Sequence, residues 1–251
     1  YNLLYEAFGW EIPTYVHCAS VMITDPDTGT VRKMSKRKGD PSYEDLMAQG
    51  YLSEAVVNYV ALLGWAPHGA LSEREFFTLP ELVDAFDISG ISKSPSAFDM
   101  DKLNYFNAAY LRAMSPDEFA QAAEPYIRQA VKNPAYNPAA IAARCEKLTD
   151  IPEKVDFFDA LPEYSAELFT NKKSKTTPEV SLNMLQAAAP ALAALPGWTQ
   201  EAIHDTLISL AGQLGVKNAT LMWPVRIALA GKAVTPGGAG EICHILGRDE
   251  T

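Results

Sequence analysis

Helix-start signals recur along the chain and restrict its fold more than any other feature. Thr78–Glu81 and Ser115–Glu118 each place a hydroxyl three residues before a glutamate, with proline in the first turn, which is the spacing of a capping box. Only Val16–Ile23 has the short apolar run with β-branched residues that predicts a strand. Further helices are expected to begin near Pro138, Pro152, Pro178, Thr199 and Ala219. The expected fold class is therefore mainly α.

Apolar residues at helical spacing support this fold class. Ser53 is expected to cap a helix that stops at Gly64. Its predicted apolar face consists of Val56, Val57, Val60 and Leu63. Further periods are Leu182, Leu185 and Ala189, followed by Ile203, Leu207, Leu210 and Leu214.

A dense cluster of cations stands between Arg32 and Gly39. The run Arg-Lys-Met-Ser-Lys-Arg-Lys-Gly carries five cations in a chain whose formal net charge is -10. It follows the turn-rich stretch 25–30 and precedes Ser42-Tyr43-Glu44-Asp45, which has the form of a capping box. Such a loop could wrap a phosphate chain with ammonium groups, backbone amides and the Ser35 hydroxyl. On charge alone, a solvated surface loop or a localisation-type basic patch is an equal alternative.

Residue order decides between these interpretations. Lys33-Met34-Ser35-Lys36-Arg37 resembles the Lys-Met-Ser-Lys-Ser signature of class I aminoacyl-tRNA synthetases, in the variant ending in Arg that is typical of glutamyl-tRNA synthetases. The resemblance is close from Tyr1 to about Arg112, and beyond that it rests on helical character and on Pro224–Gly231. The flanking segments that are similar to the family are Leu3–Trp10, Gly50–Ala55, Asn58–Trp65, Ile91–Pro95 and Phe98–Leu103.

The resemblance implies a ligase that activates glutamate with ATP, which brings Mg²⁺, and transfers the glutamyl group to tRNA-Glu. Lys36 would stabilise negative charge on the α-phosphate and the departing pyrophosphate, supported by Lys33. Ser35 would shape the ATP-binding turn, and Arg37 would contact phosphate or the acceptor end of the tRNA. For the flanking residues Arg32 and Lys38, solvated charge is at least an equal alternative.

The second ATP motif of this class, His-x-Gly-His, is missing. None of the four histidines, His17, His68, His204 and His244, has a glycine two residues later. We therefore interpret the chain as the C-terminal portion of a longer synthetase, inactive alone, whose N-terminal half completes the ATP and glutamate sites. Two alternatives stay open: a stand-alone helical tRNA-binding module and a non-catalytic protein-interaction scaffold. Retention of the whole signature favours the synthetase portion over the module.

The resemblance also implies a domain organisation. Residues 1–31 would end a class I Rossmann catalytic domain, and residues 32–115 would form the signature loop and a helical stem-contact region. Residues 116–172 and 173–251 would be the two helical bundles of an anticodon-binding domain. The polar, cationic stretch Asn171–Pro178 near their boundary is expected to be an exposed linker. The β-barrels of the related glutaminyl enzymes would need alternating strands, which this region lacks.

The acidic balance of the chain is uneven. Residues 1–115 carry 9 basic and 15 acidic residues, residues 116–170 carry 5 and 10, and residues 171–251 carry 7 and 6. The last third therefore offers local surface for a nucleic acid despite a pI near 4.9. The candidate tRNA contacts are Arg37, Arg144, Lys147, Lys172, Lys173 and Arg226. The alternative for the lysines is that they are merely solvated, and the alternative for Arg226 is that it packs structurally. Trp198 and Trp223 are expected to pack in the core rather than stack on a base.

Cysteine usage and hydropathy concern redox state and location. Cys18, Cys145 and Cys243 are isolated, which indicates neither a disulfide framework nor a zinc site, and we expect buried or half-buried thiols. No carboxylate group is an evident metal ligand. No apolar run approaches the length of a membrane span, and the first residues lack a signal pattern. We expect a cytoplasmic monomer with no membrane partner.

Overall fold

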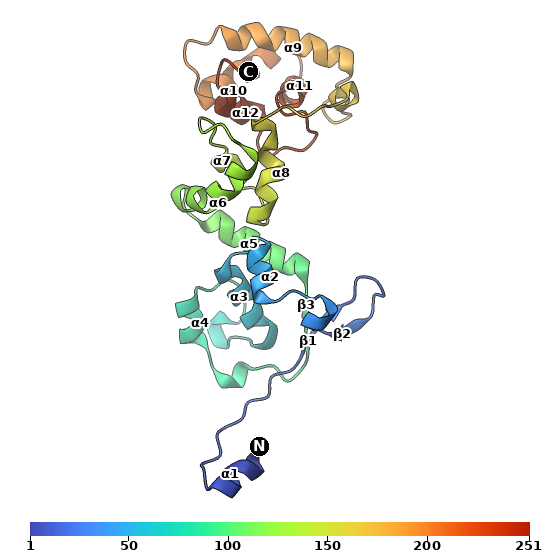
Figure 1. Ribbon diagram of the computed structural model, residues 1–251. Helices are drawn as coiled ribbons and strands as arrows, with labels where there is room; N and C mark the ends of the chain where they lie inside the picture. The colour runs from blue at the N-terminus through green and yellow to red at the C-terminus, as the bar shows by residue number, and fades with distance from the viewer. The chain divides into compact units, whose positions relative to one another are not determined.

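The chain folds into two compact units, Tyr1–Phe106 and Asn107–Thr251 (Figure 1). This computed structural model describes residues 1–251 with the exception of the side chain at position 141. Helices make up most of its regular structure, so the prediction of a mainly α chain is confirmed. No described helix is both long and apolar enough to cross a membrane.

A small three-stranded sheet lies in the first unit. β1 (Val21–Thr24) is the central strand, with β2 (Val31–Lys33) antiparallel on one side and β3 (Ser96–Phe98) parallel on the other. The strand prediction for residues 16–23 is correct only for its last three residues. The ladder begins where Val21 pairs with Ser96, and both partner strands were missed because each has only three residues.

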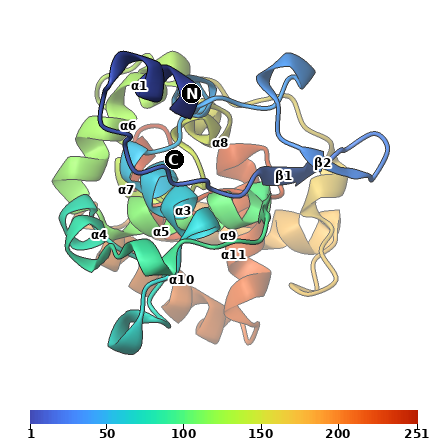
Figure 2. The same ribbon diagram turned by 90° about the horizontal axis from the view of Figure 1, so that it is seen from below.

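The turn that joins β1 to β2 is held by its own side chains, and Figure 2 shows the two strands side by side with this turn at their end. The Asp25 carboxylate accepts hydrogen bonds from the backbone N–H groups of Asp27 and Thr28 at 3.2 and 3.1 Å. Gly29 has a φ of 67°, a conformation that costs glycine little. The sequence therefore fixes a tight connection immediately before the cationic run.

Capping explains where two helices of the first unit begin. Capping boxes form at Ser42 and Thr78, as predicted. Ser53 is not a cap, because Leu52 occupies that position and the Ser53 hydroxyl accepts a hydrogen bond from Tyr43. The elements are α1 (Asn2–Phe8), η1 (Lys36–Lys38), α2 (Tyr43–Ala48), α3 (Ser53–Gly64), η2 (Gly69–Leu71), α4 (Leu79–Ala85), η3 (Ile88–Gly90) and α5 (Met100–Ala113), which ends in the second unit.

The buried face of α3 is polar as well as apolar. Asn58 is buried and donates to the carbonyl of Glu75, while its side-chain oxygen accepts the N–H of Phe77. The Tyr59 hydroxyl accepts the N–H of Asp99 at 2.7 Å and donates to the carbonyl of the same residue at 3.0 Å. Val60, predicted to face the core, is 47% exposed. These hydrogen bonds join α3 to segments 17 to 40 residues away, which periodicity alone does not reveal.

The regular elements of the second unit are all helices over its described residues. α6 packs against α7 and α8, and α9 to α12 pack against one another. The capping box at Ser115 and all five later helix starts are confirmed to within one residue. The elements are α6 (Pro116–Ala130), α7 (Ala139–Ala142), η4 (Leu148–Asp150), α8 (Ile151–Val155), η5 (Asp156–Phe158), η6 (Ala166–Phe169), α9 (Pro178–Ala193), α10 (Gln200–Gln213), α11 (Asn218–Ala230) and α12 (Ala239–Leu246).

One of the two apolar periods predicted for this unit faces the core. Ile203 and Leu207 of α10 are fully buried, as expected, whereas Leu214, the last residue of this period, is 41% exposed. In α9 the expected stripe is wrong, because Leu182 is exposed and the helix instead buries Ser181, Met184, Ala188 and Leu192. The Ser181 hydroxyl donates to the carbonyl of Phe169, so a polar residue occupies a core position that hydropathy assigns to leucine.

The stretch 171–176 is a tied turn, which corrects the prediction of an exposed linker. Asn171 and Thr176 form an isolated antiparallel bridge, and Ser174 and Thr176 are buried. The N–H of Ser174 donates to the Asn171 side chain, and the Ser174 carbonyl accepts from Thr220. Composition predicts a solvated segment, but the hydrogen bond from the Thr220 hydroxyl to the Ser174 carbonyl ties this turn to α11.

Two of the three thiols are buried. Cys145 and Cys243 lie inside the second unit, and burial raises their pKa values to about 11 and about 12. Cys18 is exposed, contrary to expectation. It lies in the segment between α1 and β1, where no strand partner covers it among the described residues.

Candidate functional site

The signature residues occupy the end of a strand and the turn that follows it. Lys33 is the last residue of β2, so it and Arg32 are not on the loop as predicted. Ser35 is extended, and Lys36 to Lys38 form the 3-10 turn η1. The turn closes through Lys38 N–H to the Ser35 carbonyl at 2.9 Å. Gly39 follows with a φ of 83°.

Four of the five cations point their charge at solvent. Lys33, Lys36, Arg37 and Lys38 are exposed. None of them forms an ion pair with a carboxylate of the described residues. Positive groups this close together repel one another, and an approaching polyanion relieves that repulsion. The arrangement suits a polyphosphate.

Arg32 is held differently, which corrects its interpretation as solvated charge. Its Nε donates to Asp25 at 2.8 Å, and its two terminal nitrogens donate to both oxygens of Asp40 at 2.6 and 2.9 Å. Its side chain is 15% exposed, and that of Asp40 is 7% exposed. Asp40 also accepts the N–H of Ser35 at 2.6 Å. Sequence reasoning missed both carboxylates, although Asp40 directly after the cationic run was an available signal.

The pKa values of the two carboxylates follow from these contacts. The Arg32 hydrogen bond, helped by the Thr28 amide, lowers the pKa of Asp25 to about 2. Arg32 and then the Ser35 amide also lower the pKa of Asp40. The carboxylates of Asp40 and Asp25 in turn raise the pKa of Arg32. All three groups are therefore charged at neutral pH, and the cluster they form carries a net negative charge.

The candidate tRNA contacts of the second unit do not gather in one place. Arg144 and Arg226 both line a cavity of about 390 Å³, together with Trp223, Thr235 and Pro236. Lys147, Lys172 and Lys173 are not among the lining residues. Lys147 lies 4.0 Å from Asp150, and Lys172 and Lys173 are exposed on the 171–176 turn.

Arg226 is fixed by its neighbours. Its terminal nitrogens donate to the Thr235 hydroxyl and the Ala233 carbonyl, both at 2.8 Å. Its guanidinium carbon lies 4.6 Å from the centre of the Trp223 ring, within cation–π range. Burial lowers the pKa of the Arg226 guanidinium. Trp223 is half-buried and donates its ring N–H to the Leu168 carbonyl.

Arg144 bridges α12 and the segment before it. It donates to the Pro236 carbonyl at 2.6 Å and to Glu241 at 2.8 Å. Glu241 also accepts the N–H of Gly238 and so caps α12. The expected core packing of Trp198 is confirmed, because it packs on the cluster of α9 to α12 and donates to the Cys243 carbonyl.

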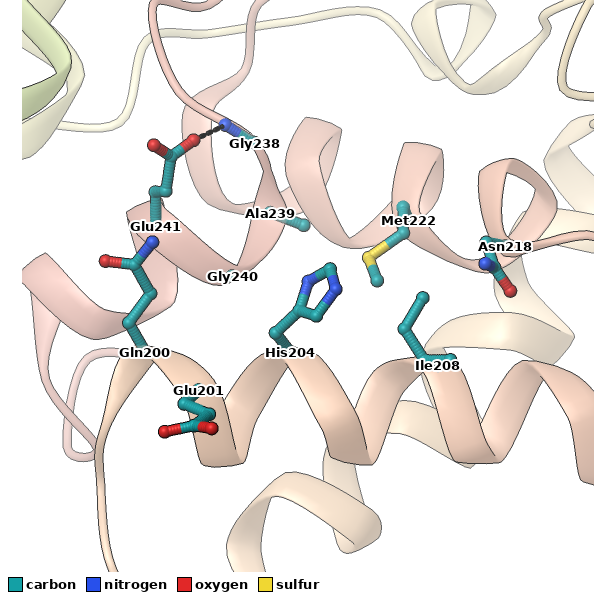
Figure 3. A pocket seen from close by; sticks show the side chains of 10 residues that line it. All are labelled: Gln200, Glu201, His204, Ile208, Asn218, Met222, Gly238, Ala239, Gly240 and Glu241. Carbon is teal, nitrogen blue, oxygen red and sulfur yellow. Dashed lines mark hydrogen bonds between the residues drawn. The ribbon is translucent and has the colours of Figure 1, made fainter.

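A larger pocket, of about 800 Å³, shares Met222, Gly238 and Ala239 with the first cavity. Figure 3 shows the side chains of His204 and Met222 pointing into the space between α10, α11 and the start of α12. Its lining is mostly apolar, and sequence reasoning gave no signal for it. Among the described residues, no three or more His, Cys, Asp or Glu side chains gather as metal ligands.

Comparisons with protein families divide the chain in two. Residues 109–251 match the family described as "Anticodon binding domain". Residues 1–105 match the family described as "tRNA synthetases class I (E and Q), catalytic domain". The first match covers more than half of the chain.

Individual proteins agree with these families. The chain is 47% identical to the glutamate–tRNA ligases of Clostridium botulinum (strain Hall) and Clostridium novyi, over 254 and 258 residues. Both alignments cover 100% of this chain and 51% of the relative. The chain thus spans about half the length of the curated relatives it matches.

Solved structures agree as well. The crystal structure of a glutamate tRNA ligase from Elizabethkingia meningosepticum in complex with its amino acid superposes with a TM-score of 0.76 at 26% identity, covering 99% of this chain and 51% of that one. The structure from Elizabethkingia anophelis, at 23% identity and a TM-score of 0.71, supports the fold. The predicted resemblance is therefore confirmed: the chain belongs to the anticodon-binding-domain family over residues 109–251 and corresponds to the C-terminal half of glutamate–tRNA ligases.

Proposed function

We propose that this chain supplies the ATP-phosphate loop and the tRNA-binding domain of a ligase that charges tRNA-Glu with glutamate. The observation that carries the proposal is the exposed turn Lys36–Lys38, whose cations form no ion pair with a carboxylate among the described residues. The His-x-Gly-His motif is lacking, so the ATP site needs residues from another segment, and the chain alone is inactive.

The chemistry assigns a role to each signature cation. The glutamate carboxylate attacks the α-phosphorus of ATP, a new P–O bond forms and pyrophosphate leaves. Lys36 stabilises the charge that develops on these oxygens, which lowers the barrier without tightening the binding of ATP itself. Lys33 assists from the end of β2. Ser35 shapes the turn through its backbone groups, and Arg37 contacts phosphate or the acceptor end of the tRNA. Mg²⁺ arrives bound to ATP.

The tRNA side of the proposal rests on the second unit. Arg226, Arg144 and Trp223 around their shared cavity offer a charged and aromatic lining to an unpaired base. Lys172 and Lys173 are exposed. They lie near the same cavity, because Ser174 of their turn is one of its lining residues. These lysines, and Lys147, contact the phosphate backbone. The proposed setting is the cytoplasm, with the ligase acting as a monomer.

A salt-dependent titration tests the tRNA part of the proposal. The chain is titrated with tRNA-Glu and with heparin as an unrelated polyanion, between about 50 and 200 mM salt. We expect the logarithm of the tRNA affinity to fall linearly with the logarithm of the salt concentration, and heparin to bind more weakly. Equally poor affinity for both polyanions at every salt concentration would exclude the ligase portion and the tRNA-binding module, and would leave the scaffold.

A further inference from the structure

Arg32 is the cation of the run that differs most from its neighbours. It makes four hydrogen bonds, three to carboxylate oxygens and one of 3.4 Å to the Lys33 carbonyl. Two negative charges surround its one positive charge, so Arg32 adds nothing to the attraction of a phosphate. To reach a ligand it would have to leave both carboxylates and expose a nearly buried Asp40.

Its partners lie at the two ends of the signature segment. Asp25 begins the turn between β1 and β2, and Asp40 follows the turn η1. The bidentate contact from Arg32 therefore joins β2 to the residue that ends the loop. A planar guanidinium makes this paired contact, whereas an ammonium cannot.

Asp40 also contacts the signature itself. One of its oxygens accepts from Arg32 and also from the Ser35 backbone N–H, both at 2.6 Å. Ser35 immediately precedes Lys36, and its carbonyl accepts the N–H of Lys38. The orientation of the 3-10 turn is thus set by a chain of contacts that starts at Arg32.

We propose that Arg32 and Asp40 act together as positioning residues that hold the Ser35–Lys38 turn in place for the reaction. The inference rests on the proposed function, because it assumes that Lys36 meets the reacting phosphates. Arg32 itself does not touch ATP. The pair fixes the backbone from which Lys36 extends, so that this lysine reaches the transition state without first ordering the loop.

A double-mutant cycle in the full-length ligase tests the proposal. The variants are Arg32→Ala, Asp40→Ala and the double variant, and the readout is glutamate-dependent ATP–pyrophosphate exchange. We expect each single variant to lower kcat by about 10- to 100-fold with the KM for glutamate unchanged. The double variant should be no slower than the slower single variant, because each single substitution already removes the contact between Arg32 and Asp40. Arg112→Ala, which removes an exposed arginine in the last turn of α5, is the matched control and should stay close to wild type.

Two further measurements separate positioning from other roles. Arg32→Lys keeps the charge but not the paired contact, so it should behave like Arg32→Ala. Amide hydrogen exchange in the absence of ATP should show faster exchange at Ser35 in both single variants, because its N–H loses the fixed Asp40 acceptor.

The outcomes are distinguishable. Multiplicative losses in the double variant, or recovery of activity in Arg32→Lys, would overturn the positioning role and indicate a direct charge on the phosphates. Unchanged exchange at Ser35 would also overturn it. A wild-type ligase that fails to exchange pyrophosphate would instead overturn the proposed function, while the Ser35 measurement would still report the structural contact.

Discussion

Two groups of cations, one in each unit, are held in opposite ways. In the first unit, Lys33, Lys36 and Arg37 are exposed and lack carboxylate partners among the described residues, beside an arginine that carboxylates surround. In the second unit, Arg144 and Arg226 are tied to carbonyl, hydroxyl and carboxylate groups. The same residue types therefore divide into cations that form no ion pair and cations that neighbouring groups hold in place. The comparison teaches that local partners, rather than charge, decide which role a cation has.

The largest effect is expected where a free cation meets the reaction. In the full-length ligase, Lys36→Ala should lower ATP–pyrophosphate exchange by about 10²- to 10³-fold, the range seen when one transition-state donor is removed. Glutamate binding, measured by calorimetry, should stay nearly unchanged, because Lys36 acts in the transition state. Arg112→Ala, which removes an exposed cation outside this turn, serves as the control. An unchanged exchange rate for Lys36→Ala would remove the distinction between the two groups of cations.

A tied cation should instead contribute to stability. Arg226→Ala removes two 2.8 Å hydrogen bonds and the contact with Trp223, so the free energy of unfolding should fall by about 2 kcal/mol. Urea unfolding measures this loss, with Lys217→Ala, an exposed lysine at the start of α11, as the matched control. If both variants unfold at the same urea concentration, Arg226 belongs with the free cations.

The exposed lysines of the 171–176 turn should affect tRNA binding rather than stability. Lys172→Ala and Lys173→Ala should change the free energy of unfolding by less than about 0.5 kcal/mol. Each should reduce the salt dependence of tRNA binding by about one unit of slope, because each removes one phosphate contact. The salt titration measures the slope. A slope that matches wild type in the double variant would show that both lysines are merely solvated.

The smallest effect concerns acid pH. The pKa of Asp25 is about 2 in the folded chain, below its ordinary value of 3.8, mainly because of Arg32. The ionised carboxylate therefore stabilises the fold fully above about pH 4, and this contribution is lost as the pH falls toward 2. In Arg32→Gln the Asp25 pKa should move back toward its ordinary value, and carbon NMR of the carboxyl group follows the titration. An Asp25 pKa that stays near 2 in the variant would show that the Thr28 amide, rather than Arg32, controls it.

Local signals in the sequence were sufficient for helix starts. Ser42, Thr78 and Ser115 each cap a helix as predicted, because a capping box involves only four consecutive residues. Strand β3 could not be found in this way, since its pairing joins Ser96–Phe98 to residues about 75 positions earlier. The buried side of α9 was assigned wrongly for a similar reason. The Phe169 carbonyl that accepts from Ser181 lies outside the helix.

The same limit applies to the candidate site. Motif order predicted a cationic turn around Lys36, because all of its residues lie in one short segment. The role of Arg32 depends on Asp25 and Asp40, seven and eight residues away, and only the fold of the β1–β2 turn brings these groups together. The polar composition of residues 171–176 likewise concealed a buried Ser174 that Thr220 holds from α11.

Burial of two thiols gives this protein a natural labelling position. With pKa values raised to about 11 and about 12, Cys145 and Cys243 are protonated and enclosed at neutral pH, and alkylating reagents need an accessible thiolate. Cys18 is exposed in the segment that leads into β1. A maleimide dye or spin label will therefore attach at Cys18 without any substitution, close in sequence to the strand that begins the signature hairpin.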